Sequence, residues 1–189
     1  YLIIPQLMGY LKSFFTFSWD IIKVAVIALV LAGLVRYFLV QPFFVEGASM
    51  EPNFLDGHYL LIDEVSYYFK EIKRGEVIVF HYPLDTSKYY IKRVIGIPGE
   101  TIEIKKGKVV IYNDDNPEGL FIDESYLLGE VITTGDTKKR LARNEFFVLG
   151  DNRLASSDSR QWGTLPRSNI VGRVWVRAWP INQAAVFGY

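Results

Sequence analysis

The stretch Gly47–Pro52 (Gly-Ala-Ser-Met-Glu-Pro) lies between an apolar run of membrane-spanning length and a series of short strand-like segments. Two small residues precede Ser49, so its hydroxyl would be open to a substrate. A serine hydroxyl is a poor nucleophile until a base removes its proton. The interpretation of the whole chain therefore depends on which residue further along supplies that base.

Lys92 is the best candidate for the base, in the segment Tyr89–Gly96 (Tyr-Tyr-Ile-Lys-Arg-Val-Ile-Gly). A lysine accepts a proton near neutral pH only if its pKa falls several units below the ordinary value of about 10.4. Burial among apolar neighbours disfavours the ammonium and produces such a shift. Spacing alone leaves a second interpretation open, in which Lys92 and Arg93 are exposed cations at the end of a strand.

Upstream of the serine, residues 21–40 form an apolar run in which Lys23 and Arg36 are the charged residues. A helix that crosses a bilayer needs about 20 mostly apolar residues, and cations near its ends can extend to the interface. We expect residues 1–40 to be a membrane anchor with its helix at about 21–40. The alternative is a cleaved signal sequence, but the run is long for that and no clean Ala-x-Ala site follows.

Downstream, residues 41–189 are rich in short β-branched and aromatic segments separated by turns, as in antiparallel sheets. The segments that we expect to be strands are 58–63, 76–82, 101–104, 108–112, 145–149 and the alternating run 173–179. The polar stretch of about 113–143 is expected to be an irregular surface excursion. The fold class predicted is therefore mostly β, an antiparallel sheet or barrel-like catalytic domain that follows an N-terminal transmembrane helix.

Composition excludes several classes of function. Lys and Arg together number 21, as do Asp and Glu, so the formal net charge is zero and no nucleic-acid partner is indicated. The absence of cysteine excludes disulfides and a thiol nucleophile. With His58 and His81 as the two histidines, a multi-histidine metal site is not expected. We expect neither a metal nor a cofactor.

A third polar stretch, Gly150–Arg160, has the sequence Gly-Asp-Asn-Arg-Leu-Ala-Ser-Ser-Asp-Ser-Arg. It places hydroxyls and opposite charges together directly after an expected strand. Such a loop is either solvated or holds a catalytic side chain in place through hydrogen bonds. Taken alone, the stretch does not decide between the two.

Taken together and in this order, these stretches resemble the bacterial type I signal peptidases, which are membrane-anchored serine endopeptidases with a Ser/Lys dyad. Three motifs follow the anchor: Gly-x-Ser-Met-x-Pro at 47–52, Tyr-x-x-Lys-Arg-Val-x-Gly-x-Pro-Gly-(Asp/Glu) at 89–100, and Gly-Asp-Asn-Arg…Ser-x-Asp-Ser-Arg at 150–160. One such motif is moderately specific, whereas the ordered set is strong.

The resemblance implies that Ser49 is the nucleophile and Lys92 the general base. It further implies that Ser156 orients the lysine ammonium through a hydrogen bond. The backbone N–H of Ser49 would donate to the oxyanion. Some relatives carry a second oxyanion donor two positions earlier as a serine, and this chain has Gly47 there.

The resemblance also implies two ion pairs around the dyad. Asp158 would hold its region through Arg160, and Asp151 would pair with Arg93. A further departure from many relatives is Asn53, which replaces a threonine and is expected to have little effect.

The substrates implied are signal-peptide-bearing preproteins, with small side chains at the first and third residues before the cut. An extended peptide would lie along strand edges, with alternate side chains in shallow pockets. The residues expected to line those pockets are Phe43, Val45, Met50, Phe54, Tyr90 and Ile91. The resemblance implies a single-pass, monomeric protein of the plasma membrane that contacts lipid, with its catalytic domain on the extracytoplasmic side.

Three other functions share part of this sequence pattern. A self-cleaving repressor-type peptidase shares the Ser/Lys chemistry but would carry a DNA-binding domain in place of the apolar run. A membrane-tethered, non-catalytic peptide-binding β-domain would not need both Ser49 and Lys92. A Ser/His hydrolase would use His58 or His81, and neither has the sequence context of a triad.

Overall fold

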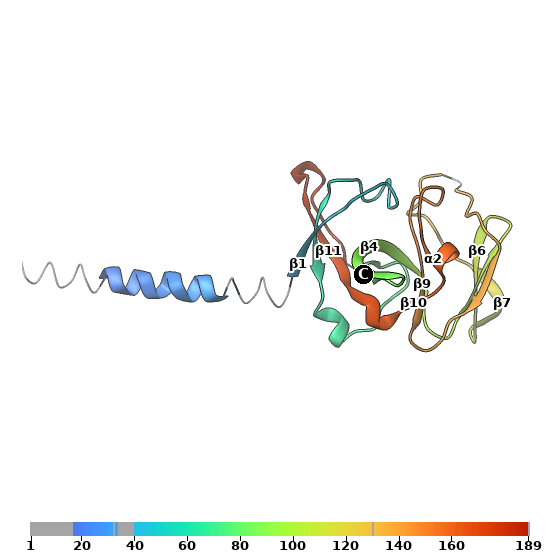
Figure 1. Ribbon diagram of the computed structural model, residues 1–189, viewed down its shortest axis with the longest axis horizontal. Coiled ribbons are helices and arrows are strands. Elements are labelled where there is room, and N and C mark those ends of the chain that lie inside the picture. Colours follow the sequence, from blue (N-terminus) through green and yellow to red (C-terminus); the bar gives the residue numbers. More distant parts are fainter. Residues whose placement is uncertain (1–16, 32, 34–39, 130, 189) are drawn as a thin grey trace, which may run out of the picture. The chain divides into compact units, whose positions relative to one another are not determined.

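The computed structural model describes residues 17–31, 33, 40–129 and 131–188 (Figure 1). The chain divides into two compact units, Tyr1–Val40 and Gln41–Tyr189. In the first unit residues 17–31 and 33 are helical. No helix among the described residues is long and apolar enough to cross a membrane. Residue 32 and residues 34–39 of the expected anchor helix lie outside the described residues.

Antiparallel sheets dominate the second unit, so the prediction of a mostly β domain is confirmed. Among the described residues, eight strands form the larger sheet, in the order β1-β2-β11-β3-β4-β9-β10, with β12 paired to β11. Their bounds are β1 (Val40–Phe44), β2 (Tyr59–Asp63), β3 (Val77–Tyr82), β4 (Asp85–Gly96), β9 (Glu145–Leu149), β10 (Leu165–Pro166), β11 (Ile170–Trp179) and β12 (Ala185–Val186).

A smaller, four-stranded antiparallel sheet has the order β7-β6-β5-β8 in the described part of the chain. Its strands are β5 (Thr101–Lys105), β6 (Lys108–Asn113), β7 (Asn116–Phe121) and β8 (Thr137–Arg140). Figure 1 shows β6 and β7 beside the larger sheet. Strands β5 and β6 form a hairpin in which Lys105 pairs with Lys108. The two residues of its turn, Lys106 and Gly107, have positive φ values of 51° and 76°, as a type I′ turn requires.

The prediction of an irregular excursion over 113–143 is wrong for β7 and β8. Strand β7 has the sequence Asn-Pro-Glu-Gly-Leu-Phe, and β8 is Thr-Lys-Lys-Arg. A strand built from residues of low strand propensity, or from a run of cations, does not show the pattern by which strands are predicted. Both strands lie at the edges of the smaller sheet, where solvent tolerates such side chains and proline is accepted.

Short helices connect the strands. They are η1 (Ser66–Tyr68), α2 (Ser159–Trp162), η2 (Arg167–Asn169) and η3 (Ile181–Gln183). The side chain of Asp158 accepts a hydrogen bond from the backbone N–H of Arg160 and so caps α2. Ser159 Oγ accepts a hydrogen bond from the Val148 N–H of β9 at 3.0 Å, which holds the start of α2 against the larger sheet.

Strand β4 links the parts of the core to the site. One cluster of buried residues lies beside the Gly47–Pro52 stretch and contains Val45, Met50, Phe54, Leu60, Ile62, Val77, Val79 and Val174. Another joins the two sheets and contains Ile95, Ile102, Ile104, Val109, Ile111, Leu141, Phe147 and Leu149. Because β4 pairs with β3 and with β9, its central residues are enclosed on both edges.

Candidate active site

Ser49 and Lys92 meet in the folded domain. Lys92 Nζ lies 2.8 Å from Ser49 Oγ, although 43 positions separate the two residues in the chain. The same nitrogen donates to the backbone oxygen of Ile91 at 2.8 Å. Lys92 sits on β4, opposite Ile78 of β3, and is 3% exposed. The alternative of an exposed lysine at a strand end is therefore excluded.

The surroundings of Lys92 favour its neutral form. Burial lowers the pKa of Lys92 to about 8, against the opposing charges of Asp158 and Asp151. The ring of Tyr90, whose centroid lies 5.3 Å from Nζ, attracts the ammonium form and so also opposes the effect of burial. At pH 7 a pKa of about 8 leaves roughly one lysine in ten uncharged. A lysine in that state can accept the proton of a serine hydroxyl.

The turn that carries Ser49 is held by its own backbone and by buried anchors. The N–H of Phe54 donates to the oxygen of Met50 at 2.9 Å, and the N–H of Gly57 donates to that of Val45 at 2.9 Å. Met50 and Phe54 are 0% and 1% exposed and pack in the core under the turn. Because these two side chains are buried in the core, they anchor the turn and leave Ser49 at its surface.

The third polar stretch closes over this turn. The backbone N–H of Asn152 donates to the oxygen of Ser49 at 3.1 Å, and Asn152 Nδ2 donates to the oxygen of Ala48 at 3.1 Å. Gly150 makes the approach possible, because a Cβ placed there would lie 2.4 Å from the Ser49 oxygen and 2.2 Å from Ser156 Oγ. A side chain at position 150 would therefore displace the turn that carries Ser49.

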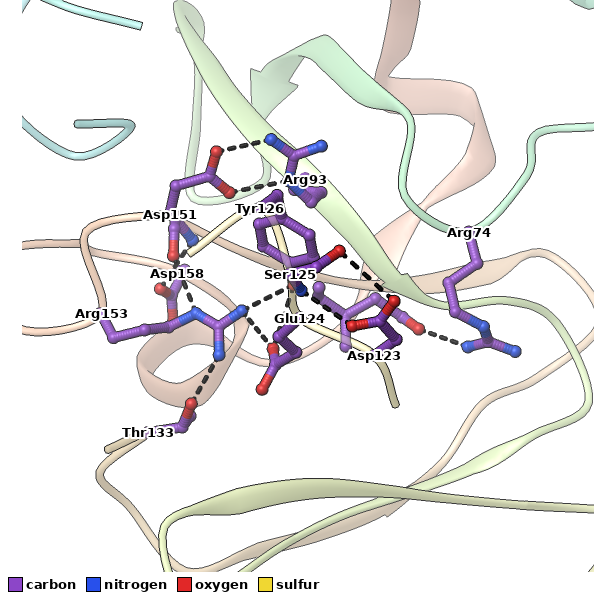
Figure 2. A network of polar contacts seen from close by, with 12 residues as sticks. Arg74, Arg93, Asp123, Glu124, Ser125, Tyr126, Thr133, Asp151, Arg153 and Asp158 are labelled. Atoms are coloured by element: carbon purple, nitrogen blue, oxygen red, sulfur yellow. Dashed lines mark hydrogen bonds and ion pairs between the residues drawn. The ribbon is translucent and has the colours of Figure 1, made fainter. Parts of the chain in front are cut away.

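Both ion pairs expected around the dyad are present. Arg93 donates to Asp151 through Nε at 2.8 Å and through Nη2 at 2.6 Å, as Figure 2 shows. Arg160 donates to Asp158 through Nε and Nη2, each at 2.8 Å. Asp158 also accepts from the Gly150 N–H at 3.1 Å. Each carboxylate is buried and paired with a guanidinium in bidentate fashion.

The expected hydrogen bond between Ser156 and Lys92 is absent. Ser156 Oγ is buried and has no hydrogen-bond partner among the described residues. The lysine nitrogen is directed instead to Ser49 and to the Ile91 carbonyl. Ser156 lies close to Gly150, on the side of the loop that faces the nucleophile turn.

Gly47 does not offer an oxyanion donor. Its backbone has a positive φ of 85°, and its N–H donates to Asp56 Oδ1 at 2.7 Å. This N–H is therefore already used in a hydrogen bond within the loop. The Ser49 N–H has no acceptor among the described residues.

A groove of about 820 Å³ opens beside the dyad. Of the six residues expected to line it, Phe43, Val45, Tyr90 and Ile91 do so. The expectation is wrong for Met50 and Phe54, which the turn directs into the core. The sequence interpretation missed further lining residues, including Leu60, Val79, Lys88, Tyr89, Ala155 and Ser157. Val79 could have been predicted as a lining residue from the register of the β3–β4 hairpin, in which it pairs with Ile91.

A serine hydroxyl in contact with a buried lysine amine, beside an open groove, defines the class of Ser/Lys hydrolases. The family model described as "Signal peptidase, peptidase S26" matches residues 18–179. The chain belongs to this family and is a serine endopeptidase.

Two relatives that are 36% and 39% identical in sequence agree with this assignment. A probable signal peptidase I-1 from Synechocystis is 36% identical over 181 residues, covering 90% of this chain and 89% of its own. Signal peptidase I from Bacillus amyloliquefaciens is 39% identical over 165 residues, covering 82% and 81%. A crystal structure of signal peptidase I from Enterococcus faecalis covers 56% of this chain and 97% of its own, at 27% identity and a TM-score of 0.47.

The close approach at Gly150 gives a first prediction. Gly150→Ala should lower kcat/KM on the order of a hundredfold, because the added methyl displaces the Ser49 carbonyl from the third polar stretch. Gly188→Ala is the control, since a Cβ there meets nothing within 4 Å. Peptide cleavage is measured on both variants below their unfolding temperatures, and equal activity in the two would contradict the account.

Proposed function

We propose that Ser49 is the nucleophile and Lys92 the general base with which this enzyme removes signal peptides from exported preproteins. Membership of the signal peptidase family supplies the reaction. The observation that supports the assignment of roles is the 2.8 Å contact between Lys92 Nζ and Ser49 Oγ at a buried amine. General bases act within this distance of the proton that they remove.

The reaction follows from this contact. Neutral Lys92 takes the proton of Ser49 as the serine oxygen attacks the scissile carbonyl carbon, giving a tetrahedral oxyanion. The resulting ammonium returns its proton to the departing amine, the carbon–nitrogen bond breaks, and an acyl-enzyme remains. A water molecule then loses a proton to the lysine and attacks the ester, which releases the signal peptide and frees Ser49.

The oxyanion requires a donor aimed at the carbonyl under attack. The Ser49 N–H is suited to this role because it is unused within the described residues. Removal of one such donor commonly costs about 10²–10³ in kcat. The Gly47 N–H is bonded to Asp56, so Ser49 is the donor that we propose.

The groove suits an extended peptide with small side chains. Its walls come from residues 42–49 and from strand β4, so a peptide between them can pair with backbone edges. Phe43 and Tyr90 contribute rings, while Val45 and Ile91 contribute branched side chains. Bulky walls leave room for residues such as alanine next to Ser49. We therefore propose small residues at the first and third positions before the cut.

The first unit is proposed to anchor the enzyme in the plasma membrane by a single span, with the catalytic domain on the extracytoplasmic side. Helical residues 17–31 are rich in exposed apolar side chains, as a lipid-facing helix requires. An anchor of this kind would bring the domain to signal peptides held in the bilayer. The proposed partners are preproteins and membrane lipid, and the proposed state is a monomer.

Variants of the dyad test the assigned roles. Ser49→Ala and Lys92→Met should each lower cleavage of a model preprotein more than about a thousandfold, because each removes a reacting group. Lys138→Met is the control, since Lys138 is an exposed lysine whose ion pair is with Glu103 on the smaller sheet. Product N-termini are sequenced to locate the cut. Near-normal cleavage by either dyad variant would exclude these roles, and binding without turnover by the wild type would favour a non-catalytic domain.

The pKa of Lys92 predicts the pH profile. Burial lowers this pKa to about 8, so the neutral base predominates above pH 8 and is lost as the pH falls. We expect kcat/KM to be half-maximal near pH 8 and to fall about tenfold per pH unit below it. A profile that stays flat from pH 8 to pH 6 would show that the base is not this lysine.

A further inference from the structure

The carboxylate of Asp151 accepts hydrogen bonds both from the strand that carries Lys92 and from the turn that carries Ser49. Arg93, the neighbour of the base on β4, donates to Asp151 through two nitrogens. Asn53, four positions after the nucleophile, donates from Nδ2 to Oδ2 of the same carboxylate at 2.9 Å. The nucleophile turn and the strand of the base are therefore joined through one buried acid, which is 3% exposed.

Both side-chain hydrogen bonds of Asn53 are donated by its amide nitrogen. Besides the bond to Asp151, Nδ2 donates to the backbone oxygen of Tyr126 at 2.9 Å. The backbone oxygen of Asn53 accepts from Arg177 Nη1 at 2.7 Å. A primary amide has two N–H donors on one nitrogen, whereas a threonine hydroxyl has one. An asparagine can thus make both side-chain bonds at once, which a threonine at this position could not.

The partner Tyr126 is itself held firmly. Its ring packs against the Arg93 guanidinium, with 4.1 Å between the guanidinium carbon and the ring centroid. Its hydroxyl accepts from Arg153 Nη2 at 2.9 Å and donates to Glu124 at 3.0 Å. Figure 2 shows Tyr126 between the Arg93–Asp151 pair and Arg153. Asn53 is therefore fastened to a rigid support on each side.

We propose that Asn53 is a positioning residue for the Ser/Lys dyad. Its amide fixes the nucleophile turn to Asp151 and Tyr126, so that Ser49 Oγ stays within hydrogen-bond distance of Lys92 Nζ. Asn53 is not one of the described residues that line the groove. It acts through its hydrogen bond to Asp151 and not on the substrate. This proposal differs from the expectation that the asparagine at position 53 has little effect. The proposal rests on the roles proposed above for Ser49 and Lys92.

The structure offers a matched control in Asn113. Its Nδ2 donates to Glu100 Oε1 at 3.0 Å, and Glu100 is buried and accepts two bonds from Arg74, at 2.9 and 2.6 Å. The arrangement of amide, buried carboxylate and guanidinium is the same as around Asp151. It contacts neither Ser49 nor Lys92 among the described residues. Loss of this amide should affect folding without moving the dyad.

The test compares Asn53→Leu with Asn113→Leu in the full chain, using a model preprotein and conditions in which both variants are folded. Asn53→Leu should lower kcat by about ten- to a hundredfold and leave KM within about twofold, because the turn loses its position while the groove remains. Asn113→Leu should lower the unfolding temperature and leave kcat within about twofold of the wild type.

A third variant, Asn53→Thr, retains one donor and should show an intermediate kcat. It also serves if Asn53→Leu does not fold. Wild-type kcat in either Asn53 variant, or an equal loss in the Asn113 control, would overturn the proposal. Ser49→Ala is assayed in parallel. If it remains active, the proposed function itself has failed, whereas an inactive Ser49→Ala beside a fully active Asn53 variant overturns the positioning role alone.

Discussion

The burial of one amine against one hydroxyl is the constraint on which this structure depends. Taking a lysine out of water disfavours its ammonium form, and Lys92 is almost fully enclosed on β4. Two carboxylates, Asp151 and Asp158, lie near enough to oppose that effect. Each of them is matched by a bidentate arginine, Arg93 and Arg160. The ion pairs therefore order the loop and limit the negative charge that would otherwise keep the lysine protonated.

The three short motifs, and the family resemblance that rests on them, predicted which side chains come together at the site. Ser49 and Lys92 are in contact, and both ion pairs that the resemblance implied are present. Short β-branched and aromatic segments predicted most of the antiparallel strands. The contact between Lys92 and Ser49 could not be predicted from the sequence alone, without the family resemblance. Spacing could not distinguish a buried Lys92 from an exposed one, since the enclosure comes from β3, β9 and the nucleophile turn.

The errors share a physical cause, which is that side-chain direction in turns and edges depends on tertiary packing. Met50 and Phe54 lie within five positions of Ser49 in sequence, yet both side chains are buried in the core. Strands β7 and β8 are polar because they are edge strands. The polar stretch between them also supports the site, since Arg153 donates to Thr133 and Glu124 there (Figure 2). Pairings across such distances are not encoded in local pattern.

The central claim is that Lys92 is an amine poised to lose its proton, and direct titration of that group tests it best. The ε-carbon resonance of Lys92 can be followed by NMR against pH in isotopically labelled protein and assigned by its loss in Lys92→Met. The account predicts a midpoint near 8, because burial lowers the pKa of Lys92 to about 8. A midpoint near the ordinary lysine value of about 10.4 would contradict it.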